Sequence, residues 1–141
     1  MKTLTDEQVV VAAISAVEQR DRDALDALYH PDVEFSWPPG LPYSGRHSGA
    51  AVADMSLHYA TTWIPLQPTA EERRMDPVIV ASSGGTVVAE YQVRGVNFHG
   101  NRFETSTLAH YTVRDGRLAS AEMYYFDLTG LQRFVSGAKL P

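Results

Sequence analysis

The sequence predicts one α+β domain in which helices cover one face of a curved antiparallel sheet. Three observations lead to this expectation. Helical periodicity is concentrated in residues 5–63. β-Branched and aromatic residues between turn signals dominate residues 78–126. The chain of 141 residues suffices for a single core, so we expect one domain over residues 1–141. A ligand pocket is expected where the helical layer and the sheet diverge.

The first helices are predicted by capping residues. Thr5 and Gln8 can form a capping box ahead of an apolar pattern at helical spacing, so residues 5–20 should be an amphipathic helix. Asp21 can cap a second helix, which Pro31 should end because proline lacks a donor and restricts the preceding residue. These two helices should form a hairpin.

A short strand and a third helix should follow. Residues 33–37 alternate as a strand, and the proline-rich residues 38–42 cannot continue its ladder. Pro65 closes the next helical pattern. The apolar face of that third helix consists of Val52, Met55, Tyr59 and Trp63.

The second half should be a series of antiparallel hairpins. Turn residues at 83–85, 99–101 and 115–116 separate β-rich segments. Asp127 can cap a last helix. The expected strands are Val78 to Ser82, Thr86 to Arg94, Arg102 to Arg114, and Arg117 to Phe126.

Composition excludes several classes of function. The net charge of -5 and the pI near 5.4 argue against nucleic acid as a partner. The absence of cysteine removes disulfides and thiolate chemistry. The acidic N-terminal residues and the lack of a long apolar run predict no signal peptide, no membrane span and a cytoplasmic location. Histidine spacing predicts no metal site, and no glycine-rich nucleotide loop predicts a cofactor.

Four segments resemble the nuclear transport factor 2-like superfamily, which includes SnoaL-like polyketide cyclases, ketosteroid isomerase and limonene epoxide hydrolase. The segments are residues 21–35, Tyr43-Ser44-Gly45-Arg46, residues 113–118 and residues 124–128. The resemblance covers nearly the whole chain. It implies a cone-shaped barrel, formed by a curved antiparallel sheet wrapped around N-terminal helices, with one ligand pocket. It does not imply a particular reaction, because this superfamily carries different functions in its pocket.

The isomerase's catalytic groups are missing at the positions that resemble them. Trp37 stands in place of its carboxylate base, Ala109 in place of its protonated acid, and the region of Ala13 in place of its tyrosine. Ketosteroid isomerisation by that mechanism is therefore not expected. The Asp-Arg-Asp apparatus of the epoxide hydrolase falls on Glu90, Gln92 and Tyr124, so its arginine is also absent.

Glu90, Glu122 and Tyr124 are the candidate catalytic residues. Alternation places Glu90 and Gln92 on one face of their strand, and the resemblance selects that face for the pocket. A carboxyl group among aromatic rings would lose hydration, which raises its pKa toward the range useful for acid or base catalysis. Tyr124 could donate to a carbonyl, epoxide or alkoxide oxygen. Each glutamate could instead lie on a solvated face or pair with an arginine.

The candidate substrate-binding residues suit a mostly apolar, oxygenated small molecule. They are Trp37, Gln92, Phe98, Phe103, Thr105, Thr107, Tyr111 and His58. His58 could serve as an acid or base in the pocket, but a histidine on a helix surface fits the same pattern.

Two functions therefore compete. One is a cofactor-independent enzyme of secondary metabolism that cyclises, isomerises, dehydrates or opens an epoxide of a polyketide- or terpenoid-like metabolite. The other is a non-catalytic module for ligand binding or assembly. A homodimer is also expected, because the outer face of the sheet should be apolar. The residues expected on that outer face are Val87, Tyr91, Val93 and Tyr125.

Overall fold

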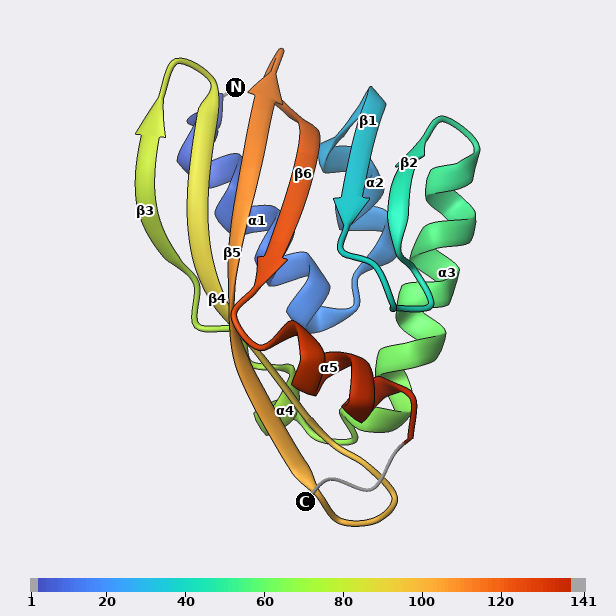
Figure 1. Ribbon diagram of the computed structural model, residues 1–141. Coiled ribbons are helices and arrows are strands. Elements are labelled where there is room, and N and C mark those ends of the chain that lie inside the picture. The colour runs from blue at the N-terminus through green and yellow to red at the C-terminus, as the bar shows by residue number, and fades with distance from the viewer. Residues whose placement is uncertain (1–2, 138–141) are drawn as a thin grey trace.

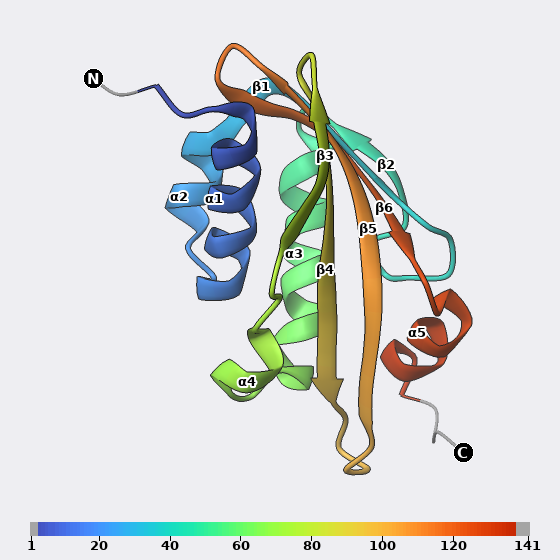
Figure 2. The same ribbon diagram turned by 90° about the vertical axis from the view of Figure 1, so that its left-hand side faces the viewer.

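The computed structural model describes residues 3–137, and it shows a curved six-stranded sheet with helices against its inner face (Figures 1 and 2). The helices are α1 (Asp6–Gln19), α2 (Arg22–Leu28), α3 (Ala51–Trp63), α4 (Ala70–Arg73) and α5 (Leu128–Val135), with a 3₁₀ turn at Ile64–Leu66. The strands are β1 (Tyr29–Trp37), β2 (Gly45–Ser48), β3 (Val78–Ser83), β4 (Thr86–Val96), β5 (Arg102–Arg114) and β6 (Arg117–Tyr125).

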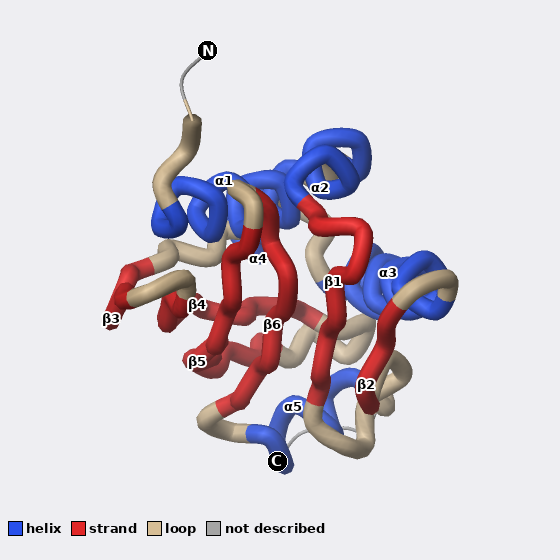
Figure 3. Tube along the Cα trace, turned by 90° about the horizontal axis from the view of Figure 1, so that it is seen from above, coloured by secondary structure: helices blue, strands red, loops and turns tan. Residues whose placement is uncertain are grey.

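The sheet has the order β2-β1-β6-β5-β4-β3, which confirms the α+β fold predicted from the sequence. Neighbouring strands are antiparallel except for β1 and β6, which run parallel. The sheet stays open, with β2 and β3 at its edges (Figure 3). No helix within residues 3–137 is long and apolar enough to cross a membrane.

The predicted caps start the first two helices. Thr5 and Gln8 form the reciprocal capping box of α1, with distances of 3.2 Å from Gln8 N to Thr5 Oγ1 and 2.9 Å from Thr5 N to Gln8 Oε1. Asp21 Oδ1 accepts from Ala24 N at 3.1 Å and begins α2. Between them, Arg20 ends α1 in the left-handed conformation, with φ of 54°. This tight turn makes α1 and α2 the predicted hairpin.

Strand β1 begins earlier than the sequence suggests. It starts at Tyr29 and includes Pro31, whereas Pro31 was expected only to end a helix. The pairing with β6 shifts register between Tyr29 and Glu34, the stretch that contains the proline. An irregular stretch tolerates a residue that cannot donate to the ladder. The short elements β2 and α4 were not predicted.

The inner face of the sheet consists of odd-numbered residues on the three central strands. On β4, Val87, Ala89 and Val93 are buried, and on β6 the buried residues include Ala121 and Met123. Helices α1 and α3 cover this face (Figure 2). The strand register explains why the buried residues are odd-numbered on all three strands, because Tyr91 pairs with Thr107 and Thr107 pairs with Tyr125.

The expected apolar outer face is wrong. Val87, Tyr91 and Val93 are buried in the core, and Tyr125 packs against that core. The alternation of β4 had left both faces open, because each carries apolar groups. These residues are therefore not available as the dimer surface that the sequence predicted.

Candidate functional site

A cavity of about 260 Å³ lies between helices α1 to α3 and the inner face of the sheet. Its size is slightly below the ~300–1,000 Å³ of common ligand pockets, which favours a compact ligand. Most of its wall is apolar. The aliphatic and thioether side chains in the wall are Val17, Leu25, Met55, Ala60, Ile64, Met75 and Val93.

Aromatic rings also form part of the wall. Tyr59 of α3 lies 5.4 Å from the Trp37 ring and 5.0 Å from the Tyr43 ring, measured between centroids. Trp63, one helical turn further, has its centroid 6.5 Å from that of Tyr59. The spacing of Tyr59 and Trp63 by four residues places both side chains on the same face of α3. Strand and helix thus meet in one aromatic cluster.

The tyrosines of the pocket are neutral at physiological pH. Burial raises the pKa of Tyr59, and the neighbouring phenols of Tyr43, Tyr111 and Tyr29 raise it further. Burial also raises the pKa of Tyr29 to about 12. A neutral phenol keeps its proton and can donate it in a hydrogen bond. Tyr29 and Tyr59 both line the cavity and can therefore act as donors to a ligand oxygen.

Trp37 presents a further donor. It lines the cavity, and its buried indole Nε1 has no hydrogen-bond partner among residues 3–137. A buried polar group without a partner costs free energy, on the order of 1–3 kcal/mol, but this nitrogen is itself buried, so it would reach a ligand acceptor only after the ring turns. Two neutral polar side chains, Ser56 and Gln67, also line the cavity on its helical side.

Three arginines line the rim of the cavity. Arg20 and Arg22 come from the turn between α1 and α2, and Arg73 comes from α4. In Figure 2 that turn lies above α4, on the same side of the sheet. Arg22 is already paired with Asp26, at 3.0 Å. The residues that line this cavity include no Asp, Glu or His.

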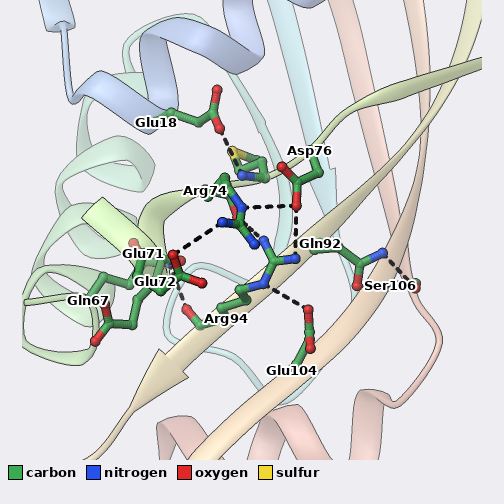
Figure 4. Close-up of polar contacts among 11 residues, drawn as sticks. Glu18, Gln67, Glu71, Glu72, Arg74, Asp76, Gln92, Arg94, Glu104 and Ser106 are labelled. Carbon is green, nitrogen blue, oxygen red and sulfur yellow. Dashed lines mark hydrogen bonds and ion pairs between the residues drawn. The ribbon is translucent and has the colours of Figure 1, made fainter. Parts of the chain in front are cut away.

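Several acidic side chains in and after α4 pair with arginines in the polar network of Figure 4. Arg94 pairs with Asp76 at 2.9 Å and with Glu104 at 2.8 Å. Arg74 pairs with Asp76 and with Glu71, each at 3.1 Å. This network joins the segment after α4 to strands β4 and β5. Its carboxylates are already paired with arginines.

The face expected to carry the catalytic carboxylates is the wrong one. Glu90 pairs with Leu108, which pairs with Tyr124, so Glu90 and Tyr124 lie on the outer face of the sheet. Glu122 lies on that face too, opposite His110. None of the three predicted catalytic residues lines the cavity. The physical reason is the core itself: it takes the odd-numbered residues of β4 and β6, and these are more apolar.

The predicted binding residues divide into two groups. Trp37 and Gln92 line the cavity, although the Gln92 side chain donates to Ser106 Oγ at 3.0 Å. The other group lies on the inner side without lining the cavity. It consists of Phe103, Thr105, Thr107 and Tyr111.

The structural roles of this second group are visible in its contacts. Phe103 stacks on Phe134 of α5 with a centroid distance of 5.2 Å. Thr105 Oγ1 accepts from Asp127 N at 3.0 Å and so fixes the start of α5. Phe98 and His58 lie elsewhere, in a more open hollow between α3, the β4–β5 loop and α5.

Sequence reasoning did not assign Tyr59, Tyr29, Arg20 or Arg73 to the site. The helical pattern predicts Tyr59 on the apolar face of its helix, but it does not indicate that this face borders the pocket. The arginines carried no signal, because their convergence depends on the turn after α1 meeting α4, which are about 50 residues apart in the chain.

The chain has a nuclear transport factor 2-like fold, as solved structures with similar architecture indicate. TerC co-crystallised with polyporic acid is similar in structure, with a TM-score of 0.77 and 19% identity over 93% of this chain and 98% of that one. A nuclear transport factor 2-like protein of unknown function from Burkholderia pseudomallei has a TM-score of 0.76 and 24% identity, over 93% and 97%. A protein from Xanthomonas campestris with the provisional name polyketide cyclase has values of 0.67 and 24%, over 95% and 96%.

The family follows from the sequence. The chain belongs to the SnoaL-like domain family, whose model matches residues 10–121. The comparison with curated proteins finds no match. At these identities the similar structures establish the fold, which agrees with the resemblance of the four sequence segments.

Proposed function

We propose that this chain is a cofactor-independent enzyme that cyclises or isomerises a small polyketide- or terpenoid-like metabolite in the cavity beside Tyr59. The observation that carries the proposal is the set of hydrogen-bond donors in an apolar wall. Tyr59, Tyr29 and the unpartnered Trp37 indole all border the cavity. Donors fixed in an apolar site stabilise negative charge that develops on a carbonyl oxygen.

Enolate chemistry suits these groups better than water activation. Epoxide opening and dehydration need a base or acid such as a carboxylate, and no carboxylate lines the cavity. Cyclisation and isomerisation can start from a substrate enolate that is already ionised in solution, so they need no base in the cavity. The enolate carbon then attacks a carbonyl carbon to close a ring, or takes a proton at a new position, and a phenol or water supplies the proton to the product. The provisional name of the Xanthomonas protein, polyketide cyclase, supports this choice as an analogy.

The experiment compares metabolite extracts before and after incubation with the protein by untargeted mass spectrometry. A product of unchanged mass indicates cyclisation or isomerisation, loss of one water indicates dehydration, and gain of one water indicates epoxide opening. With the metabolite identified, Tyr59→Phe should lower kcat by about 10²-fold or more, the scale for loss of one donor to a developing oxyanion. The ring stays, so binding should change little.

Glu90→Gln tests the alternative in which Glu90, as the sequence suggested, is the catalytic acid or base. From its position on the outer face, Glu90 should contribute nothing to turnover, and the variant should match the wild type. A loss of turnover in Glu90→Gln with full activity in Tyr59→Phe would contradict the assignment to the cavity. Tyr124 is 51% exposed, so Tyr124→Phe is the matched control for removal of a phenolic hydroxyl.

A binding module is the second candidate function, and one observation favours it: the cavity wall contains no residue that can act as a general base near neutral pH. In that case extracts would stay unchanged while a ligand co-purified with the protein. TerC, whose crystals contain polyporic acid, offers a precedent for a small ligand on this fold.

Assembly as a homodimer stays a prediction, now with a different surface. Tyr124 and Phe126 are 51% and 67% exposed on the outer side of the sheet. Such apolar groups are candidates for burial against a second copy. Light scattering of the wild type and of Tyr124→Glu at micromolar concentrations would test this surface.

A further inference from the structure

We propose that Arg20 and Arg73 form an anion-binding rim, so that the cavity takes a compact, mainly apolar molecule carrying one ionised oxygen group. Aromatic carboxylates and preformed enolates share this chemistry. The inference names the substrate class of the proposed enzyme and rests on its cavity, but the test below measures binding and needs no turnover.

The charges of Arg20 and Arg73 are not neutralised by an ion pair within residues 3–137. None of the ion pairs among residues 3–137 includes Arg20 or Arg73. Arg20 donates only to neutral oxygens of Gln67, over long distances of 3.3 Å to Oε1 and 3.4 Å to the carbonyl oxygen. Arg22 differs, because Asp26 neutralises it at 3.0 Å.

No acidic side chain within residues 3–137 lies at ion-pair distance from Arg20 or Arg73, and several that are close in the chain have other partners. Glu18, close to Arg20 in the chain, accepts from Met75 N at 2.8 Å, and Glu71, close to Arg73, pairs with Arg74 at 3.1 Å (Figure 4). Glu72 accepts from the hydroxyl of Thr69. The positive rim is therefore a local feature of a chain whose net charge is -5.

The two guanidinium groups also repel each other. Partial burial lowers the pKa of Arg20 below its ordinary value, and the like charge of Arg73 lowers it further. Arginine nevertheless stays protonated in proteins. An anionic group between the two would relieve this repulsion, and a carboxylate geometry matches the fork of either guanidinium.

The rest of the cavity explains why the ligand should be apolar behind its charged end. Past the rim, the wall consists mainly of aliphatic and aromatic side chains. The wall also lacks a base. A reactant that arrives already ionised would not need one, which reconciles an enolate mechanism with this wall.

The test uses 2-naphthoate and its neutral analogue 2-naphthamide, two probes of nearly the same shape. Binding is measured by calorimetry and by tryptophan fluorescence, which reports the cavity because the chain's two tryptophans, Trp37 and Trp63, both line it. We expect 2-naphthoate to bind at least tenfold more tightly, with an affinity that falls as salt is added.

Arg20→Gln and Arg73→Gln should each weaken 2-naphthoate several-fold and leave 2-naphthamide unchanged. Arg117→Gln makes the same change in net charge at an exposed position outside the cavity and should leave both affinities unchanged. Equal affinity for the two probes, or equal effects of Arg117→Gln and Arg20→Gln, would overturn the anion site and leave the cavity proposal intact. Failure of both probes to bind would overturn the anion site. The enzyme proposal is tested separately, by the kcat of Tyr59→Phe.

Discussion

The indole Nε1 of Trp63 donates a hydrogen bond of 3.0 Å to the hydroxyl of Tyr43, and both side chains are buried. Trp63 is the last residue of α3, and Tyr43 lies in the connection between β1 and β2. The bond therefore joins the helical layer to the loop at the edge of the sheet. Because Trp63 also lines the cavity, the same bond fixes part of the cavity wall.

Tyr43→Phe should destabilise the fold by about 1–3 kcal/mol, because it leaves the buried Trp63 N–H without its acceptor. Urea unfolding followed by circular dichroism measures this change. Tyr124→Phe serves as the control, since the exposed hydroxyl should matter by less than about 0.5 kcal/mol. Equal stability of the two variants would show that the Tyr43–Trp63 bond contributes nothing net.

Gly95→Ala should destabilise the fold by about 1–3 kcal/mol through overpacking. A Cβ atom at Gly95 would lie 2.8 Å from Cε2 of Phe134 and 3.2 Å from the carbonyl oxygen of Leu66. Phe134 is fully buried, so its ring has little room to retreat. Gly95→Ala combined with Phe134→Leu should recover part of the loss measured for Gly95→Ala alone. Additive losses would contradict the clash.

Stability should fall steeply above pH 10. Burial raises the pKa of Tyr43 and of Tyr29 to about 12, from 10.0 for an exposed phenol. Above pH 10 the unfolded chain releases these protons while the folded chain retains them, so the unfolded state binds fewer protons and stability decreases with pH. The contribution is fully present below pH 10 and is lost as pH rises through about 12.

Tyrosinate absorbance and urea unfolding over this pH range provide the measurements. The shift for Tyr43 alone corresponds to on the order of 2 kcal/mol. Tyr43→Phe should therefore show a shallower loss of stability between pH 10 and 12. Ionisation of all seven tyrosines near pH 10 with an unchanged circular dichroism spectrum would contradict the prediction.

Arg20→Gly should separate ligand binding from stability. Arg20 adopts φ of 54°, a left-handed conformation that costs a non-glycine residue roughly 1–2 kcal/mol, whereas glycine adopts it readily. Glycine also gives the unfolded chain more freedom, which offsets about 0.4–1 kcal/mol of that gain. We expect stability unchanged or raised by up to about 1 kcal/mol, together with weaker binding of 2-naphthoate. A clear loss of stability would assign Arg20 a structural role.

Most of the fold was predictable from local signals. Thr5 and Asp21 cap their helices as predicted, and β5 has the predicted bounds of Arg102 to Arg114. Capping residues and turn dipeptides such as Asp115-Gly116 act within a few residues, so a short stretch of sequence suffices to predict helix starts and turns. The parallel contact of β1 with β6 depends on residues about 90 positions apart, which no local pattern specifies.

The candidate site was predictable only in part, because it depends on which face of each strand lies inside. On β5, the inner residues Thr107 and Tyr111 were assigned to the correct face, but on β4 and β6 the opposite face was chosen. Paired residues share a face, so Tyr91 opposite Thr107 excludes Glu90 from the inside. Register depends on both strands of a pair, and a shift of one residue reverses every side chain.

The position of β1 in the sheet has a consequence for how the chain folds during synthesis. Within residues 3–137, β1 pairs with β2 and with β6, and β6 begins at Arg117, about 80 residues after the end of β1 at Trp37. As the protein leaves the ribosome, the β1–β2 hairpin and the first three helices emerge well before the strand that joins them to the rest of the sheet. Their apolar faces therefore have no permanent cover until about 80 further residues have been made. Such long-range pairing slows folding, so the nascent chain is expected to depend on chaperones during this interval.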